Sequence, residues 1–351
     1  MRRVVAGFIA LMAAAPLCAP VKAQSVADFY RGKTINMVVG YTAGGGYDLY
    51  ARALARHMGK HIPGNPGFVV NNMPGAGSLT AANFLYNVAP KDGTAIGTIG
   101  RGLAMEPLIG KSNVQFDSRR FTWIGSGTNE ISVCAVSSTS PVKTWEDVLT
   151  TPISVGGEGS GSDPDTFAIL MRNLFGAKLN LVTGYPGGAE ITLAIERGEV
   201  DGRCGWSLSA INATRPDWIK QNRLRFLLQM SLERNPELPD VPAVVEKAKD
   251  QRQKDILKLV FSRQVMGRPF LGPPGIPEDR KQALRNAFDA TLKDPEFLVD
   301  AKKIGLEVNP VSGATIDKLL AELYETPKET LDLARAAVVG EAQRTMPGGK
   351  H

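Results

Sequence analysis

Short apolar segments alternate with amphipathic segments along most of this chain. The first apolar segment, Met37 to Val39, has no helical spacing and is typical of a buried strand in a parallel sheet. Apolar residues then recur at helical spacing after Asp48, and the strand and helix pattern repeats to about residue 99. Strands that alternate with crossover helices predict an α/β fold built on a mostly parallel sheet.

Three predicted strands in this first part each lead into a turn rich in glycine. The second strand spans 68–70 and is followed by the turn 71–78, and the third spans 95–99 and ends at 100–102. Ligands of parallel α/β sheets bind beyond the carboxyl ends of the strands. We therefore expect these turns and the turn at 40–48 to meet at one edge of the sheet.

The same pattern restarts in the second half of the chain. Two extended segments, 121–124 and 131–136, precede a strand at 153–155, a glycine-rich turn and a helix at 165–175, for which Asp163 is the expected N-cap and Pro164 the first residue. Further strands are predicted at 179–183, 199–206, 224–228 and 264–271, and further helices at 278–292 and 314–336.

The turn before the first long helix has the composition of an anion site. Gly44, Gly45 and Gly46 allow the backbone N–H groups to approach a ligand, and Asp48 stands where an N-cap is expected. The N–H groups and the positive end of the helix dipole would then face the same point. The turn at 159–162 predicts a second such site. No Lys follows Gly46 and the glycines lack the G-x-G-x-x-G spacing, which argues against nucleotide binding.

The N-terminus predicts export. Arg2 and Arg3 precede an apolar run, and a small-residue cleavage site at 21–23 follows, so residues 1–23 are expected to be a signal peptide. The formal net charge of +6 over 351 residues falls to +3 without Arg2, Arg3 and Lys22. The sequence contains no basic run of the kind that would indicate a nucleic-acid-binding surface. Two cysteines remain, Cys134 and Cys204, and the sequence leaves open whether they pair or stay separate thiols.

Six motifs in order resemble those of the periplasmic solute receptors of tripartite tricarboxylate transporters, also called Bug or TctC-like proteins. The resemblance covers about Ile35 to Leu320, and the motifs stand at 43–52, 72–77, 90–93, 159–162, 198–202 and 273–277. It implies a two-lobed periplasmic binding protein of the Venus flytrap type, each lobe a mostly parallel sheet flanked by helices. The lobes are expected at 24–128 plus 232–351 and at 129–231, with the ligand cleft between them.

The resemblance further implies a monomeric periplasmic receptor, not an enzyme, that binds a small carboxylate and delivers it to membrane subunits of such a transporter. No cofactor, metal or nucleic acid is expected. His57 and His61 are four residues apart, but we interpret them as part of a solvated basic helix face. A sensor subunit for a signalling partner remains an alternative. An α/β hydrolase is disfavoured because no G-x-S-x-G motif is present.

The candidate ligand residues are those of the two glycine turns and the neighbouring strand ends. Asp48 could instead cap its helix, the tyrosines could simply pack, and Arg101 and Arg203 could bridge elements of the protein rather than pair with a carboxylate. Against the family pattern, the chain has Gly40-Tyr41-Thr42 before the first turn, Asn71 in the second turn, Asp165 where a His is frequent, and Arg101 after the third strand. The candidates are Tyr41, Thr42, Ala43, Gly44, Gly45, Gly46, Tyr47, Asp48, Gly75, Ala76, Arg101, Gly159, Ser160, Gly161, Ser162, Tyr185 and Arg203.

Overall fold

Two mixed six-stranded sheets organise the chain. The computed structural model describes residues 24–110, 114–340 and 344–345, so the predicted signal peptide lies outside the described residues. The strands are β1 (Thr34–Val39), β2 (Gly67–Asn72), β3 (Ala95–Thr98), β4 (Thr122–Ser126), β5 (Ser132–Ser137), β6 (Ile153–Gly156), β7 (Leu179–Thr183), β8 (Gly202–Ser207), β9 (Leu224–Met230), β10 (Pro269–Gly272), β11 (Val311–Ser312) and β12 (Arg344–Thr345).

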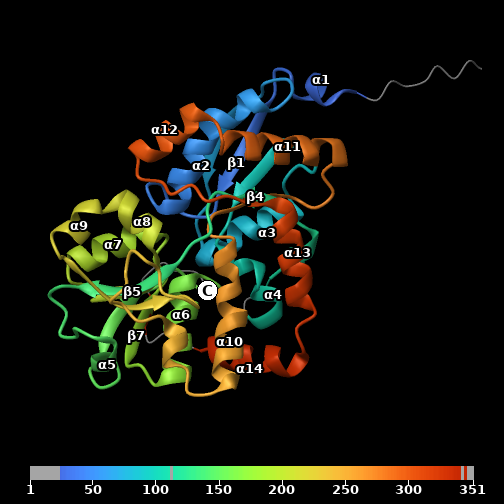
Figure 1. Cartoon of the computed structure of the whole chain (residues 1–351). Helices are drawn as coiled ribbons and strands as arrows, with labels where there is room; N and C mark the ends of the chain where they lie inside the picture. Colours follow the sequence, from blue (N-terminus) through green and yellow to red (C-terminus); the bar gives the residue numbers. More distant parts are fainter. Residues whose placement is uncertain (1–23, 111–113, 341–343, 346–351) are drawn as a thin grey trace, which may run out of the picture.

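Helices cover both sheets (Figure 1). The α-helices are α1 (Val26–Tyr30), α2 (Gly46–His57), α3 (Leu79–Asn87), α4 (Glu106–Ile109), α5 (Trp145–Val148), α6 (Asp163–Phe175), α7 (Gly188–Glu196), α8 (Leu208–Thr214), α9 (Pro216–Lys220), α10 (Gln251–Phe261), α11 (Glu278–Thr291), α12 (Pro295–Lys303), α13 (Gly313–Tyr324) and α14 (Lys328–Val338). Short 3₁₀ helices are η1 (Met58–His61), η2 (Ala76–Ser78), η3 (Arg101–Ala104), η4 (Ser118–Arg120), η5 (Val244–Lys247) and η6 (Ser262–Val265).

The first sheet has the order β11-β4-β10-β3-β1-β2. Its strands β2, β1 and β3 are parallel, whereas β10 runs antiparallel to both β3 and β4. The parallel strands β1 to β3 confirm the predicted crossover pattern. Their carboxyl ends lead into α2, η2 and η3, so the three glycine-rich turns meet at one edge as expected. We call this sheet and its helices the first unit.

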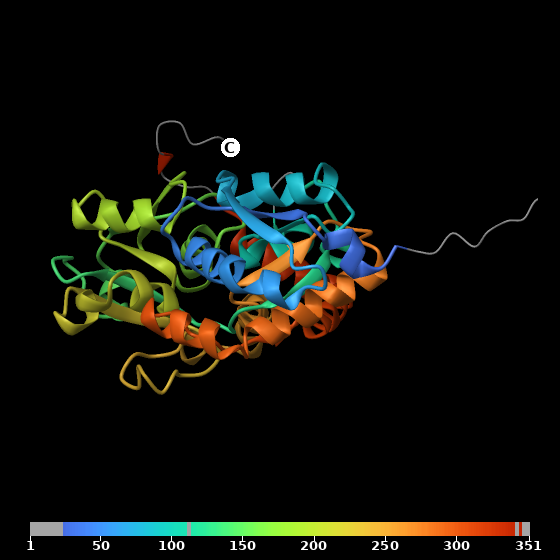
Figure 2. The same ribbon diagram turned by 90° about the horizontal axis from the view of Figure 1, so that it is seen from above.

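The second sheet has the order β12-β7-β6-β8-β5-β9. β7, β6 and β8 are parallel, and β5 is antiparallel to β8 and β9. Seen from above, this second unit, with α7 to α9, lies beside the first rather than over it (Figure 2). In this unit the buried strands β6, β7 and β8 alternate with α6 and α7. Both units therefore have the α/β architecture that the sequence predicts.

Paired segments cross between the units. Gly127 N–H donates to the Arg268 carbonyl and Gly267 N–H to the Thr128 carbonyl, each at 3.0 Å, while Glu130 N–H donates to the Gln264 carbonyl at 2.9 Å. These bonds join the segment after β4 to the segment before β10. The largest apolar cluster includes residues of both units, such as Val38 and Phe167. The crossing and this cluster hold the two sheets in one arrangement.

Several local predictions need correction. The strand expected at 264–271 is shorter, because residues 262–265 form η6. The helix expected at 314–336 is two helices, α13 and α14, since Pro327 lacks the N–H that a continuous helix needs and stands as the N-cap of α14. β12 pairs with β7 in the second sheet, although residues 232–351 were assigned to the first lobe. The lobe boundaries themselves stay a prediction.

Cys134 and Cys204 form a disulfide, the question that the sequence left open. The two residues are register partners on the antiparallel strands β5 and β8. Both side chains are fully buried. The bond closes a loop with a sequence separation of 70 residues and joins β5, which begins just after the crossing, to β8.

Removing this disulfide is expected to destabilise the fold. Closing a loop of this length limits the unfolded chain, and loss of such a bond costs about 2 to 4 kcal/mol. Urea unfolding should therefore give a lower free energy of unfolding for the Cys134→Ala, Cys204→Ala double variant. A reductant should lower the stability of the wild type and leave the double variant unchanged; equal sensitivity of both proteins would contradict the assignment.

Candidate functional site

A pocket of about 150 Å³ lies between residues of the two units. The first unit contributes the turn that begins α2, and the second contributes the start of α7, part of β8 and part of α8. One further residue comes from the crossing. The lining residues are Tyr41, Gly44, Gly45, Gly46, Tyr47, Glu158, Gly188, Ala189, Thr192, Leu193, Arg203, Trp206, Ser207, Ala210, Thr214, Arg215 and Arg268.

The first wall is the predicted glycine turn. Gly44 has a φ of +84°, which reverses the chain after β1, and α2 begins at Gly46 with Gly45 as N-cap. Asp48 is therefore the third residue of the helix rather than the predicted N-cap. Its carboxylate bends back to accept the Gly44 N–H at 2.9 Å. The first N–H groups of a helix have no acceptor within it, so the N–H groups of Gly46 and Tyr47 in this wall are available to a ligand.

Asp48 supports this turn from behind. Its carboxylate accepts hydrogen bonds from Arg52 and, at 2.9 Å, from the Asn72 side chain. Burial alone would raise the pKa of Asp48, but the bonds from Arg52, Gly44 and Asn72 outweigh it and lower that pKa below its ordinary value. The alternative that the sequence left open, a structural role at the helix start, agrees with this position.

Two stacked tyrosines continue the first wall. The rings of Tyr41 and Tyr47 have centroids 4.7 Å apart at an interplanar angle of 29°. The Arg268 guanidinium lies 4.8 Å from the centroid of the Tyr47 ring, and the Tyr47 hydroxyl accepts the Arg101 N–H at 3.2 Å. Both tyrosines line the pocket, so aromatic residues form part of its first wall.

The second wall combines the start of α7 with an ion pair. Arg203 Nη2 donates to Glu158 Oε1 at 2.8 Å, and both residues line the pocket. A Cβ on Gly188 would lie 2.4 Å from Arg203 Nη1, so a larger residue there would have to displace the guanidinium. Burial raises the pKa of Glu158 above its ordinary value, and Arg203 opposes that shift.

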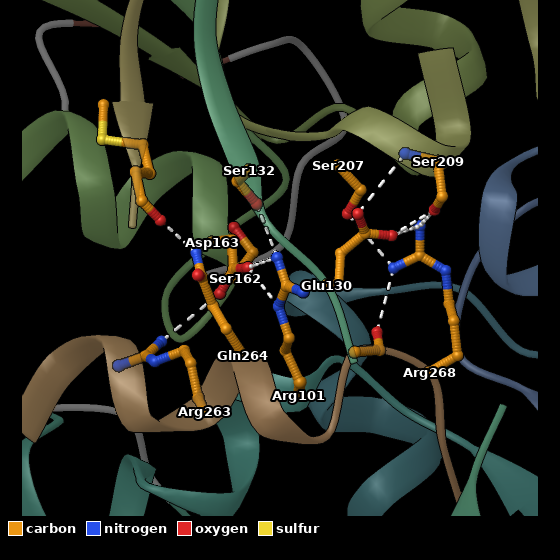
Figure 3. Close-up of polar contacts among 12 residues, drawn as sticks. Arg101, Glu130, Ser132, Ser162, Asp163, Ser207, Ser209, Arg263, Gln264 and Arg268 are labelled. Carbon is orange, nitrogen blue, oxygen red and sulfur yellow. Dashed lines mark hydrogen bonds and ion pairs between the residues drawn. The ribbon is translucent and has the colours of Figure 1, made fainter. Parts of the chain in front are cut away.

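Arg268 joins the pocket to the crossing. Its side chain is 1% exposed and points to the second unit, where Nη1 and Nη2 donate to the hydroxyls of Ser207 and Ser209, each at 3.1 Å (Figure 3). Nη2 also lies 3.3 Å from Glu130 Oε2. Sequence reasoning did not single out Arg268. An arginine inside a predicted apolar strand was the available signal, because a buried charge requires partners.

The second predicted anion turn does not line this pocket. The N–H groups of Glu158 and Gly159 donate to Asp165 Oδ2 at 2.7 and 3.0 Å, and the Ser162 hydroxyl donates to the same atom at 2.9 Å. Ser162, not Asp163, is the N-cap of α6. A carboxylate of the chain itself thus occupies the donors that were predicted to face a solute.

Contacts with the first unit cover the same turn. Gly77 N–H donates to the Glu158 carbonyl at 2.9 Å, which places the 75–78 turn directly against it. The remaining predicted ligand residues lie away from the pocket wall, and their contact with a ligand stays a prediction. They are the exposed Ala43 and Ser160, the half-buried Thr42 and Gly159, the turn residues Gly75 and Ala76, the buried Gly161 and Ser162, and Tyr185, which packs in an apolar cluster of the second unit.

Arg101 bridges the two units. Its Nε donates to Asp163 Oδ2 at 2.6 Å, and its Nη2 donates to the Ser132 hydroxyl at 2.5 Å (Figure 3). Arg263 Nη1 lies 3.5 Å from Asp163 Oδ1 on the other side. The Arg101 side chain is 1% exposed and does not line the pocket. This position fits the alternative in which Arg101 bridges elements of the protein.

The predicted basic helix face carries ion pairs. His57 and His61 contact Asp300 and Asp294 at 3.1 and 2.9 Å. Among the described residues, His57, Asp294 and Glu296 could geometrically hold a metal. The Lys60 ammonium, however, lies 2.6 Å from Asp294 and 2.5 Å from Glu296, so a cation of the chain already contacts both carboxylates. This cluster carries no metal assignment.

Comparison with known proteins places the chain beside solute receptors. Residues 50–332 match the model of the tripartite tricarboxylate transporter family receptor. A relative from Cupriavidus necator, the UPF0065 protein in the gbd 5′ region, is 27% identical over 342 residues, which cover 94% of this chain and 97% of that protein. Across the part of the chain that the structure describes, no helix combines the length and apolar character of a membrane span.

Solved structures show the same fold. The periplasmic binding protein BugD matches with a TM-score of 0.70 at 22% identity, over 90% of this chain and all of that chain. The R. palustris protein Rpa4515 with adipate matches with a TM-score of 0.67 at 20% identity, over 86% and 97% of the two chains. The predicted two-lobed periplasmic binding protein fold is confirmed.

Breaking the bridge between the units should destabilise the protein. Arg101→Met leaves Asp163 buried with only the longer contact to Arg263, and removing one partner of a buried pair costs about 3 to 5 kcal/mol. Urea unfolding measures this loss. Arg31→Met removes the exposed partner of Asp28 and is the matched control, for which we expect stability close to the wild type. Equal losses in both variants would contradict the bridge.

Proposed function

We propose, from the premise that this chain belongs to the tripartite tricarboxylate transporter receptor family, that it is an exported receptor for a small carboxylate solute. The solute is held in the pocket between the two units, and the receptor delivers it to the membrane subunits of a tripartite transporter. Residues 1–23 serve as the signal peptide for the periplasm. The chain itself performs no chemistry on the solute.

The observation that carries this proposal is the composition of the pocket wall. Backbone donors at the start of α2, the Ser207 hydroxyl and the guanidinium groups of Arg203 and Arg268 surround about 150 Å³ of space. Helix N-termini and arginines both stabilise a bound carboxylate. Each charge-assisted hydrogen bond contributes about 1.5 to 3 kcal/mol, so a few reach the roughly −8 kcal/mol of micromolar binding.

The proposed function includes closure of two lobes around the crossing. The first lobe is proposed at 24–128 plus 232–351 and the second at 129–231, with β12 as a terminal strand that returns to the second sheet. Segments 127–130 and 264–268 would act as the hinge, because both cross between the units and backbone hydrogen bonds tie them to each other. Rotation there opens the pocket to solvent.

The alternatives receive less support. A hydrolase needs a nucleophile with a base in reach, but neither described histidine lines the pocket and both contact aspartates elsewhere. A sensor subunit would hold the solute in the same way and differ only in its partner. The family match favours transport over sensing.

Calorimetry with a panel of small acids tests the proposal. We expect at least one of succinate, malate, adipate, citrate, butyrate, hexanoate and benzoate to bind with a Kd of about 1 to 100 μM, because the wall provides several charge-assisted donors. Chromatography of the same mixtures after long incubation should recover every acid unchanged. Formation of product with no measurable binding would reject a receptor in favour of an enzyme.

Gly45→Val tests the position of the site. Gly45 has a φ of −82° and an extended ψ, and a Cβ there meets only the Thr42 carbonyl at 3.9 Å, so the fold tolerates the change. The branched side chain would fill the pocket beside the α2 donors, and we expect binding of any panel acid to fall more than about tenfold. Gly67→Val on the outer strand β2, with its nearest contact at 3.7 Å, is the control. Unchanged affinity in Gly45→Val would place the site elsewhere.

A further inference from the structure

Carboxylates of the chain already neutralise the arginines deep in the pocket. Arg203 pairs with Glu158 at 2.8 Å, and Arg268 lies 3.3 Å from Glu130. All four residues are at least nine-tenths buried, so water screens these pairs little. Each guanidinium can still donate to a solute, but neither brings an unmatched positive charge.

The arginine at the rim of the pocket also has a carboxylate partner. Arg215 Nε lies 3.4 Å from Glu196 Oε1. Glu190, in the first turn of α7, accepts the Thr42 hydroxyl at 2.8 Å and offsets the positive end of that helix. Every arginine that lines the pocket therefore has a carboxylate partner, and α7 brings an additional acidic group close to it.

The second glycine turn offers no further anion site. Its N–H groups at Glu158 and Gly159 donate to Asp165, and the adjacent Asp163 pairs with Arg101 and, at 3.5 Å, with Arg263. The positive end of α6 is thus matched inside the protein, and it lies outside the pocket wall.

The start of α2 is the positively polarised group of the pocket to which we assign the solute anion. A helix N-terminus is equivalent to about half a positive charge, and α2 is 12 residues long. Asp48 takes the Gly44 N–H, and its charge is balanced by Arg52 at 2.9 Å. Gly46 and Tyr47 follow it and line the pocket, and the first N–H groups of a helix have no acceptor within it, so they are available to a single carboxylate.

The rest of the wall is suited to an apolar body. Tyr41 and Tyr47 are stacked on each other, and Trp206, Leu193 and Ala210 of the second unit line the same pocket. Leu193 is 41% exposed, so this side of the pocket opens to solvent. An apolar solute body would cover surface here that otherwise contacts water.

Resting on the proposed receptor function, we propose that the solute is a monocarboxylate with an apolar body, and that Glu158 is the residue that rejects a second carboxylate. A dicarboxylate would bring its second charge beside Glu158 and Glu190 without a spare cation to pair it. Burial of an unpaired charge is strongly unfavourable. The charge balance of the pocket thus selects one anionic group per solute.

Matched acids test the inference on the wild-type protein. Calorimetry would compare butyrate with succinate and hexanoate with adipate, in which a carboxylate replaces the terminal methyl group, and benzoate with terephthalate, in which a carboxylate replaces a ring hydrogen. We expect the monocarboxylate to bind about tenfold or more tightly in each pair that binds. A dicarboxylate that binds equally or better overturns the inference and leaves the receptor function intact. Absence of binding by all six and by the wider panel would reject both.

Glu158→Gln tests the named residue. Loss of this charge leaves Arg203 uncompensated, so the affinity for succinate and adipate should rise about tenfold more than the affinity for butyrate and hexanoate. Glu246→Gln makes the same charge change at an exposed pair with Arg234 and should alter neither class. An equal change for mono- and dicarboxylates assigns Glu158 a structural role and overturns its selectivity role. Circular dichroism confirms folding, and if Glu158→Gln unfolds, the wild-type comparison decides.

Discussion

Burial of arginines between two sheets is the constraint on which this structure depends. Arg101, Arg203, Arg263 and Arg268 are all nine-tenths buried or more. A charge that is buried without a partner costs several kcal/mol, so each guanidinium requires a nearby carboxylate. Arg101 from the first unit finds Asp163 in the second, and Arg268 in the crossing finds Glu130. Ion pairing therefore stabilises the arrangement in which the two units lie in this structure.

Carboxylates of the chain also determine which glycine turn stays available to a ligand. α2 and α6 each carry an aspartate as third helical residue, and each carboxylate bends back over the preceding turn. Asp48 accepts one backbone N–H, from Gly44, whereas Asp165 accepts two backbone N–H groups and the Ser162 hydroxyl. The first turn keeps donors for a solute, and the second is satisfied by its own chain.

The sequence predicted the fold well because its signals are local. Apolar runs such as 37–39 and 153–155 became β1 and β6, and the glycine turn at 44–46 lines the pocket. The break at Pro327 was also a local signal, but the apolar periodicity on either side hid it. Disulfide pairing was not predictable, because it depends on the register of β5 against β8.

The polar part of the site was harder to predict, since it depends on side chains from distant segments. Arg268 reaches the pocket only because the crossing places it between Tyr47 and Ser207. Likewise, Asp165 marks a departure from the pattern of similar receptors, but its sequence position alone does not say that its carboxylate turns back to fill the adjacent turn. Whether a turn has free N–H groups is known only once the acceptor of each N–H group has been identified in the structure.

Internal contacts also determine what a solute must supply. The Gly77 bond to Glu158, the Thr42 bond to Glu190 and the Arg101 pair with Asp163 already join the two units. A ligand shifts an equilibrium between open and closed forms only through contacts that differ between them. In a pocket whose side-chain charges are balanced, the contacts that favour the closed form come from the N–H donors at the start of α2 and from burial of apolar surface. Such burial contributes about 25 cal/mol per Å² removed from water. The carboxylate would then orient the solute in the pocket, and the apolar body would favour closure of the two units. A pocket with an unpaired positive charge could obtain both effects from the carboxylate alone.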